Sequence, residues 1–384
     1  MPHSFAEIFL VFLRLGLTSF GGPMAHLGYF REAIVEKKKW LSDVAYADLV
    51  ALCQFVPGPA SSQVGLGIGL SAGGLRGALA AWLGFTMPSA IAMAALGIYA
   101  ASGAGIPSGI LHGLKILAVG VVAQAVLGMA RGLCPDAKRA TLAALAAGAI
   151  LMAGNAWVQV LAIAAAALAG GFWLRGEAAA QKGEAGGQLS VPAGLKRFAP
   201  IALLVFVVLL VLAVALPGGL ATSSYKAGSL VFGGGHVVLP LLEADMVPGV
   251  VDEDTFLAGY GAVQGVPGPL FTFASYIGGA AGGWGGAAVA TLAIFLPSFL
   301  LIIGVLPYWS QLVTLPGVRA AVMAANAAVV GVLAAAFYNP VFTSAIKEPR
   351  DLAIAILTFV ALTSWKVPSW VLVLVLGVLG SIFL

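Results

Sequence analysis

Long apolar stretches, interrupted by glycine and proline, dominate the pattern of hydrophobic and polar positions along the chain. A helix needs about 20 mainly apolar residues to cross the hydrocarbon core of a bilayer. Stretches of that length lie at 75–101, 107–132, 198–216, 286–306 and 316–338. The chain lacks the alternating segments of about ten residues that are typical of a membrane β-barrel. Because helices satisfy their own backbone hydrogen bonds in lipid, we predict an all-α integral membrane protein.

The composition supports the same class. Hydrophobic residues make up 61% of the 384 residues and charged residues only 9%, whereas soluble domains carry about 25% charged residues. So few charges cannot cover a soluble surface, and we expect a multi-pass protein of the cytoplasmic (inner) membrane. Cys53 and Cys134 follow no metal-binding or redox spacing, and no catalytic motif is visible. We therefore expect no cofactor, no bound metal and no enzymatic activity.

A short motif rich in proline and glycine occurs twice, 210 residues apart. The two copies are Gln54-Phe55-Val56-Pro57-Gly58-Pro59 and Gln264-Gly265-Val266-Pro267-Gly268-Pro269. Upstream lie Phe20-Gly21-Gly22 with His26, and Phe232-Gly233-Gly234 with His236; downstream lie Pro88-Ser89 and Pro297-Ser298. Pro/Gly breaks at corresponding positions of a duplicated hydrophobic chain are the best sequence pointer to the binding site of a transporter.

The duplication divides the chain into three predicted parts. They are an N-terminal transmembrane repeat at 1–175, a cytoplasmic linker with one connecting transmembrane helix at 176–219, and a C-terminal transmembrane repeat at 220–384. Each repeat is expected to run from a helix that ends at the Phe-Gly-Gly break into a charged segment (31–43; 243–254). Two short helices then flank the Pro-Gly-Pro (43–72; 254–283), and a long hairpin (75–132; 286–338) and a final helix pair (140–174; 350–384) follow.

The charged segments of the two repeats have opposite signs. The first contains Arg31 and three consecutive lysines at 37–39, whereas 243–254 contains five carboxylates and no lysine or arginine. By the positive-inside rule the first segment is cytoplasmic and the second lies outside. The single linker helix would then invert the second repeat, so we predict inverted-topology repeats with Pro/Gly-broken helices.

The two Pro-Gly-Pro segments predict sharp helix breaks. Proline removes a backbone donor and disfavours helix at the residue before it, and at membrane depth such a break must be buried in protein or line a wet cavity. New helices are expected near Ala60 and Leu270, and their free N–H groups and positive dipole ends suit an anion. Tight turns at the membrane surface are the alternative, although surface turns would not require the matched Gln54 and Gln264.

Cations inside apolar segments are the second candidate feature. Arg14 and Lys226 each lie six residues before the phenylalanine of a Phe-Gly-Gly break. A cation at membrane depth is costly unless it faces a cavity, a partner or the interface, so the matched positions favour a site, with snorkelling to the headgroups as the alternative. Lys115 is a third candidate, and Asn326 is its counterpart in the second repeat.

Carboxylates are scarce at membrane depth, which points to an anionic substrate. The histidines either shuttle protons or form hydrogen bonds at helix ends. The predicted substrate-binding residues are Arg14, Gly21, Gly22, His26, Gln54, Pro57, Gly58, Ser61, Ser62, Lys226, Gly233, Gly234, His236, Gln264, Pro267, Gly268 and Thr272, with Lys115 and Asn326 as additional candidates.

These motifs resemble those of the chromate ion transporter (CHR) family in its two-domain form. The resemblance is carried by Phe20-Gly21-Gly22-Pro23 with His26, Trp40-Leu41-Ser42, Phe232-Gly233-Gly234-Gly235-His236 and the two Pro-Gly-Pro motifs. It implies export of chromate across the cytoplasmic membrane, driven by the membrane potential or a proton gradient, and often chromate resistance. The expected partners are a small oxyanion (chromate, with sulfate as its isostere), the bilayer, protons as the candidate coupling ion and a second copy as the candidate homodimer, but no nucleic acid.

Three alternatives stay open at this point. A sulfate or other oxyanion importer would carry chromate only incidentally. A passive anion channel would use the Pro-Gly-Pro breaks as its pore lining. A membrane-embedded enzyme acting on a lipid phosphate would need a nucleophile or metal cluster, and the sequence shows neither. The direction of flux and its coupling to an energy source separate an exporter from the first two.

Overall fold

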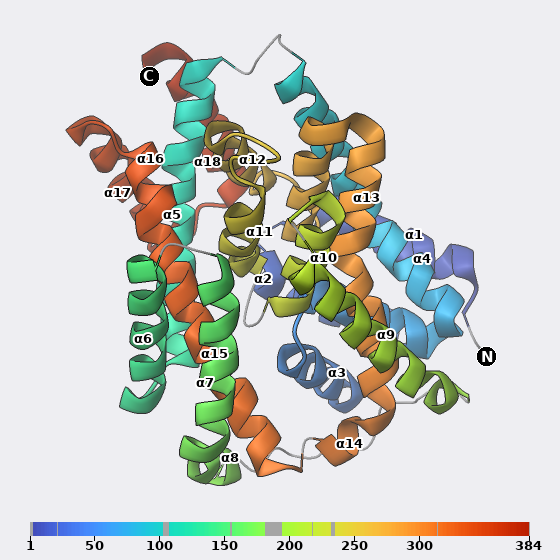
Figure 1. The fold of residues 1–384 in the computed structure, drawn as a ribbon. Coiled ribbons are helices and arrows are strands. Elements are labelled where there is room, and N and C mark those ends of the chain that lie inside the picture. Colours follow the sequence, from blue (N-terminus) through green and yellow to red (C-terminus); the bar gives the residue numbers. More distant parts are fainter. Residues whose placement is uncertain are drawn as a thin grey trace.

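The computed structural model describes residues 3–20, 22–102, 107–153, 156–180, 194–216, 218–231, 235–312 and 314–383. Every regular element within these ranges is a helix (Figure 1). Five helical spans are long and apolar enough to cross a membrane: Ala60–Ala101, Ser108–Leu133, Leu195–Ala215, Leu270–Leu312 and Pro316–Ala345. Each contains most or all of one of the five stretches expected from the sequence, so the predicted all-α membrane class is confirmed.

The first repeat begins with a helical hairpin. α1 (Phe5–Thr18) runs to the first break, and α2 (Gly22–Phe30) with the π-helical η1 (Arg31–Lys37) returns from it. The Lys38 ammonium lies 3.6 Å from the Glu7 carboxylate, and the His3 backbone N–H donates to the Ala72 carbonyl at 2.9 Å. The start of α1, the end of η1 and the region of Ala72 therefore lie together at one end of the molecule.

A second hairpin follows in the same repeat. α3 (Asp43–Phe55) leads into the Pro-Gly-Pro segment and α4 (Ala60–Ala101) leads out of it. α4 is not continuous, because Gly73 (φ −150°, ψ 20°) and Gly74 (φ 64°, ψ −156°) are non-helical. A Cβ at Gly69 would lie 2.3 Å from the Gly77 carbonyl oxygen, although eight residues of straight helix span about 12 Å. The chain thus reverses at Gly74, whose positive φ favours glycine.

The second repeat copies this geometry. Its elements are α10 (Leu220–Leu230), η2 (Gly235–Val237), α11 (Val238–Met246), α12 (Glu253–Val263), η3 (Leu270–Thr272) and α13 (Phe273–Val305). Gly282 (φ −154°, ψ 26°) and Gly283 (φ 60°, ψ −152°) break α13 with nearly the dihedrals of the break in α4. A Cβ at Gly278 would lie 2.4 Å from the Gly286 carbonyl oxygen, so this helix also folds back on itself.

The helices form two groups, and each group draws on both repeats (Figure 1). In the first group α4 packs against α1 and α13, and α13 also packs against α10 and α9 (Leu195–Ala215). The second group contains α5 (Ser108–Leu133), α6 (Ala137–Ala153), α7 (Ala156–Trp173), α15 (Pro316–Ala336), α17 (Pro349–Thr363) and α18 (Ser369–Phe383). There α17 and α18 pack on α5, while α6 and α7 pack on α15. The two repeats are therefore intertwined.

Short helices complete the described chain: α8 (Arg175–Ala180), η4 (Leu306–Tyr308), α14 (Trp309–Leu312), the π-helical η5 (Phe337–Phe342) and α16 (Thr343–Ala345).

The two glycine breaks lie at opposite ends of the α4–α13 pair. A Cβ at Gly97, near the end of α4, would lie 2.1 Å from the Tyr276 carbonyl oxygen, close to the break in α13. The two helices therefore run antiparallel with their backbones in contact, as small residues allow in membrane proteins. This is the arrangement of inverted repeats. Which end is cytoplasmic stays a prediction from charge, and labelling of cysteines placed at 31–43 and 247–253 from the same side of the membrane would contradict it.

Candidate functional site

The breaks of the two repeats meet in the interior. The Gly58 N–H donates to the Val231 carbonyl at 2.6 Å, and the Gly268 N–H donates to the Ser19 carbonyl at 3.0 Å. Val231 and Ser19 end α10 and α1, so each Pro-Gly-Pro segment binds the first break of the opposite repeat. Both glycines are buried and have positive φ, 126° at Gly58 and 99° at Gly268. The breaks are thus held inside the protein rather than at its surface.

The matched Pro-Ser pairs approach the same junction. A Cβ at Gly58 would lie 3.3 Å from Ser298 Oγ, and one at Gly268 would lie 2.8 Å from Ser89 Oγ. Several buried polar atoms at the breaks or within about one turn of these pairs lack a hydrogen-bond partner among the described residues: Ser19 Oγ, Ser62 Oγ, Gln63 Oε1, Thr86 Oγ1, Ser298 Oγ and both ring nitrogens of His26. Buried polar atoms are normally satisfied by protein, water or ligand. The junction is therefore a candidate passage for a polar solute.

A cavity of about 290 Å³ lies beside the second Pro-Gly-Pro segment. Its polar lining residues are Gln124, His236, Gln264, Lys366 and Ser369, and Gly22, Gly268 and Leu270 also contribute. These residues come from the start of α2, α5, η2, the end of α12, the Pro-Gly-Pro segment with the start of η3, and the turn that leads from α17 into α18. No Asp or Glu lies among the described lining residues, so the cavity offers one cation and several donors but no carboxylate.

Hydrogen bonds hold the cavity walls in place. Ser369 Oγ donates to the Gln264 carbonyl at 2.8 Å, and Gln124 Nε2 donates to the Leu362 carbonyl at 3.3 Å. His236 Nδ1 lies 2.7 Å from the Tyr260 hydroxyl. Each glutamine amide has two N–H groups, so Gln124 retains a donor beyond the bond it makes. The turn between α17 and α18 is thereby fastened to the end of α12.

The structure distributes the predicted site residues over several places. Gly22, His236, Gln264 and Gly268 line the cavity. Predicted residues at the junction of the breaks are His26, Pro57, Gly58, Ser61, Ser62, Pro267 and Thr272. Gly21, Gly233 and Gly234 lie outside the described residues.

Arg14 and Lys226 are not brought to the cavity. Lys226 forms an ion pair with Asp245 on α11, and both side chains are largely buried. Arg14 is exposed and shares a surface hollow with Glu32, Lys37 and Lys38. Each cation is therefore accommodated within its own first hairpin, by a buried carboxylate in one repeat and by the charged segment in the other. Their contact with substrate stays a prediction, and the cavity does not depend on it.

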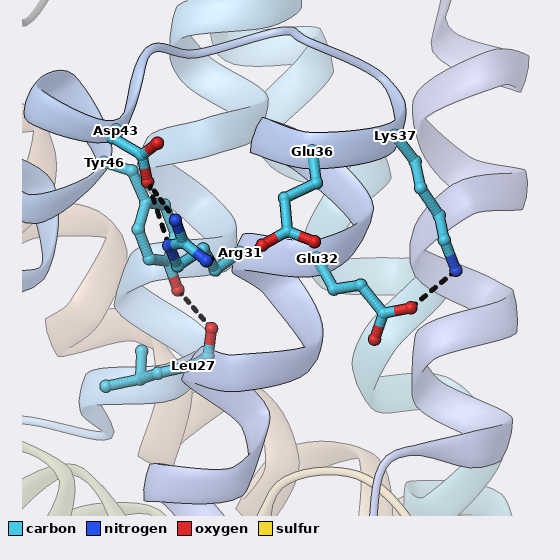
Figure 2. Close-up of polar contacts among 7 residues, drawn as sticks. All are labelled: Leu27, Arg31, Glu32, Glu36, Lys37, Asp43 and Tyr46. Atoms are coloured by element: carbon cyan, nitrogen blue, oxygen red, sulfur yellow. Dashed lines mark hydrogen bonds and ion pairs between the residues drawn. The ribbon is translucent and has the colours of Figure 1, made fainter.

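The charged segment beside Arg14 is an ordered polar network (Figure 2). Arg31 Nε donates to Asp43 Oδ1 at 2.9 Å and Lys37 Nζ donates to Glu32 Oε1 at 2.6 Å. The hydrogen bond from Lys37 lowers the pKa of Glu32. The Tyr46 hydroxyl donates to the Leu27 carbonyl at 2.6 Å. These contacts tie α2 and η1 to the start of α3.

Gln54 and Gln264 are equivalent in sequence but differ in environment. Gln264 is 8% exposed, whereas Gln54 is exposed. α12 packs against α5 so closely that a Cβ at Gly261 would lie 2.5 Å from the Leu114 carbonyl oxygen. Among the described helices, α3 has no comparable packing against α15, the counterpart of α5, and Figure 1 shows the two apart.

The unpacked face of α3 matches the packed face of α12. Exposed residues on α3 follow helical spacing at Val44, Ala47, Ala51 and Gln54. Their equivalents 210 residues later are Asp254, Leu257, Gly261 and Gln264. Leu257, Gly261 and Gln264 are buried, and Asp254 pairs with Lys115 of α5. One repeat therefore presents a closed helix pair and the other an open one.

Three cavity residues, Gln124, Lys366 and Ser369, are missing from the sequence-based candidates. That selection relied on matched pairs, and the equivalent stretch of the first repeat, 151–158, contains no lysine or arginine. The available signal was a lone cation followed by Pro368 in an otherwise apolar C-terminal segment. Of the additional candidates, Lys115 lies at the other end of α12, and Asn326 is partly buried on α15 with Oδ1 unpaired in the described part of the chain.

Comparison with known proteins gives a consistent result. A family model described as "Chromate transporter" matches residues 6–171 and 218–381. A chromate transport protein of Cupriavidus metallidurans is 26% identical over 371 residues, which cover 95% of this chain and 89% of that protein. A chromate transport protein of Pseudomonas aeruginosa is 28% identical over 303 residues (78% and 72%), and a probable chromate transport protein of Synechococcus elongatus is 25% identical over 402 residues (99% and 96%). No solved structure is significantly similar to the chain.

Proposed function

The chain belongs to the chromate transporter family, and from this premise we propose that it is a secondary active transporter that exports chromate across the cytoplasmic membrane by alternating access. Family membership makes it a multi-pass membrane transporter of a small oxyanion rather than an enzyme. The observation that carries the proposal is the cavity beside the second Pro-Gly-Pro segment, which combines Lys366, two glutamine amides and a helix start without a described carboxylate.

The donor set of this cavity suits a tetrahedral dianion. Chromate accepts hydrogen bonds and donates none when fully ionised, so its site must supply N–H and O–H groups. The Lys366 ammonium gives charge-assisted hydrogen bonds, which are roughly twice as strong as neutral ones. The first N–H groups after Pro269 have no partner within their own helix and lie at its positive end. Gln124 and Gln264 add amide donors that can position a ligand oxygen.

Sulfate has the same charge and nearly the same shape as chromate. Hydrogen bonding alone discriminates such isosteres poorly. The cavity offers donors of general type, so we expect sulfate to compete for the site. The physiological preference would then reflect the supply of anions as well as their affinity.

The difference between α3 and α12 supports alternating access. α12 is closed on α5, and α3 is open with respect to α15. If the basic 31–43 segment is cytoplasmic, this arrangement corresponds to a state that opens toward the cytoplasm. Closure of α3 on α15 together with release of α12 from α5 would expose the junction to the other side. A channel would instead require both ends to open at once.

Export needs only the membrane potential as a driving force. Moving one charge through 100 mV is worth about 2.3 kcal/mol, so a dianion gains about 4.6 kcal/mol on leaving a negative interior, roughly a 2,000-fold concentration ratio. Protons are the alternative coupling ion, with His26 and His236 as their candidate carriers. Chromate resistance of the host cell would follow from either form of coupling.

Uptake of radiolabelled chromate into inverted membrane vesicles tests the proposal. We expect accumulation when the vesicle lumen is made positive, inhibition by sulfate, and no uptake in vesicles without the protein. Flux that only equilibrates would indicate a channel, and accumulation in right-side-out vesicles would indicate an importer. Absence of flux from correctly inserted protein would refute chromate as the substrate.

A further inference from the structure

We propose that Lys115 forms a second anion site at the end of α5 that lies beside the acidic segment 243–254. In the structure described here, the carboxylate of Asp254 occupies this site. The ligand class is a small oxyanion. The inference rests on the proposed function only for the choice of that ligand. It assigns a role to Lys115, which lies apart from the cavity at the Pro-Gly-Pro segment.

Lys115 is a buried cation with an exposed partner. It lies on α5 within the buried segment 113–122 and is 7% exposed. Its ammonium forms an ion pair with Asp254 Oδ1, and the Asp254 side chain is 66% exposed. Asp254 lies in the first turn of α12, so the ion pair joins the packed helices α5 and α12 where α12 begins.

The two partners depend on each other unequally. A buried ammonium without a counter-ion carries a large desolvation cost, so Lys115 requires an anion. An exposed carboxylate is well solvated by water and gains little from a surface ion pair. An anion that reaches Lys115 can therefore replace Asp254, because the carboxylate loses little free energy when it returns to water. The free energy of the exchange depends mainly on how well the new anion compensates the desolvation of the Lys115 ammonium.

A polar hollow gives such an anion room. It has a volume of about 410 Å³ and is lined by Lys115, Asp254, Asn339 and Lys347, among others. Lys347 Nζ donates to the Thr343 carbonyl at 3.3 Å, and the Lys347 contact with Asp351 Oδ2, at 2.9 Å, is made by its backbone N–H rather than by its ammonium. Glu253 is the other carboxylate at the hollow. With Asp254 turned away, two ammonium groups would face one carboxylate, which favours an oxyanion over a cation.

The related helix pair, α15 with α3, lacks an equivalent site. The counterpart of Lys115 on α15 is Asn326, and the counterpart of Asp254 on α3 is Val44. The ion pair is therefore specific to the end that carries the acidic segment. An anion bound at Lys115 would remove a contact that holds α12 on α5. Because the anion binds only when Asp254 has left, its binding favours the released state.

Sulfate-dependent thermal stability of the purified full-length protein tests this site. Asp254→Asn removes the internal competitor, so we expect half-maximal stabilisation at about tenfold lower sulfate concentration than in the wild type. Adding Lys115→Gln to Asp254→Asn should abolish this increase in sulfate sensitivity. Only the stabilisation through the cavity beside the second Pro-Gly-Pro segment should remain. Glu253→Gln is the matched control, because it removes the neighbouring charge without freeing Lys115. Equal responses of Asp254→Asn and Glu253→Gln, or a gain that survives Lys115→Gln, would overturn the inference.

A second measurement keeps the test decisive if Asp254→Asn is unstable. In a background in which Cys53 and Cys134 are replaced by alanine, Asp254→Cys is alkylated with anionic and cationic thiol reagents of equal size. We expect faster reaction with the anionic reagent, protection by sulfate, and loss of both effects on adding Lys115→Gln; equal rates would refute the site. Neither measurement uses flux. Sulfate binding at Lys115 without chromate export would count against the proposed function alone, and export without a Lys115 response would count against this inference alone.

Discussion

The two Pro-Gly-Pro segments share a backbone conformation and differ in what surrounds them. Gly58 and Gly268 both have positive φ, and each donates a hydrogen bond to the opposite repeat. The glutamines that precede them differ in environment, since Gln264 is buried and Gln54 is exposed. The break is thus a local property that duplication preserves. Closure around it is a property of packing, and it can differ between identical motifs.

In the function that we propose, this difference is what would let near-symmetric halves serve a directional process. Fully equivalent surroundings would present the same cavity to both sides of the membrane. Here one helix pair is closed and its counterpart open. Exchange of the two arrangements is the simplest motion that the duplication allows, because each state then resembles the other with the repeats interchanged.

The largest expected effect comes from locking each helix pair in turn. In a background without Cys53 and Cys134, a short bifunctional thiol reagent should link Lys115→Cys to Asp254→Cys at once, because the native side chains are already paired. Linking Val44→Cys to Asn326→Cys should require the opposite arrangement. Either link should abolish chromate flux in vesicles, since alternation needs both pairs to open.

The linking rate of the 44–326 pair shows whether the two helix pairs exchange their open and closed arrangements or whether one pair stays open permanently. Chromate and an imposed potential should change the linking rate of the 44–326 pair, whereas a permanently open pair would never link. Unimpaired flux after complete linking at 115–254 would contradict the exchange. Each single cysteine variant treated with the reagent is the control for the chemistry.

A second, smaller effect is expected at Lys366. Lys366→Met should weaken chromate binding about 10- to 100-fold, because a hydrogen bond to a charged group contributes about 1.5–3 kcal/mol. Lys366→Arg should retain most of the affinity. Lys366 has a left-handed backbone with φ 54°, and methionine and arginine accept this conformation as well as lysine does. The stability of the protein should therefore change little. Binding of labelled chromate to purified protein measures the effect.

Lys196→Met is the matched control for Lys366, since it removes a lysine near the start of α9, remote from the cavity in sequence. Equal affinities of Lys366→Met and the wild type would remove the cation from the proposed site. The helix start and the two glutamines would then have to hold the dianion alone.

The smallest effect separates the two glutamines directly. In protein linked at 115–254, Gln264→Leu should lower sulfate affinity about three- to tenfold, because a neutral hydrogen bond contributes about 0.5–1.5 kcal/mol. Gln54→Leu should leave affinity unchanged in this locked form. In protein linked at 44–326 the ranking should reverse. Equal effects of each substitution in both locked forms would mean that Gln54 and Gln264 do not exchange their exposed and buried environments.

Much of the fold could be predicted from the sequence because its signals are local. Apolar length identifies the five membrane helices, and proline with glycine identifies the broken ones. Helix starts at Ala60 and Leu270 follow from the same rule. By contrast, the sequence analysis assigns no helix between the Phe-Gly-Gly breaks and the charged segments, where α2 and most of α11 lie, because a nine-residue helix is far below the length of a membrane span.

The candidate site was harder to predict, because matched positions do not reveal what a side chain faces. Gln264 and Gln54 match in sequence, yet only Gln264 lines the cavity. Arg14 and Lys226 match as well, and their own hairpins accommodate both. Lys366 has no counterpart, so a search for pairs passes over it. Its place in the cavity depends on α17 and α18 packing against α5, a contact between segments more than 200 residues apart.

The intertwined packing of the repeats also constrains how this gene can change. α5 is covered by α17 and α18 from the far half of the chain, and α15 by α6 and α7. A substitution on α5 therefore changes the packing of residues that are encoded some 700 base pairs away in the gene. The two ancestral copies are no longer independent modules, and compensating mutations should arise across the halves. Deletion of either copy would leave each helix group without the helices that this copy contributes.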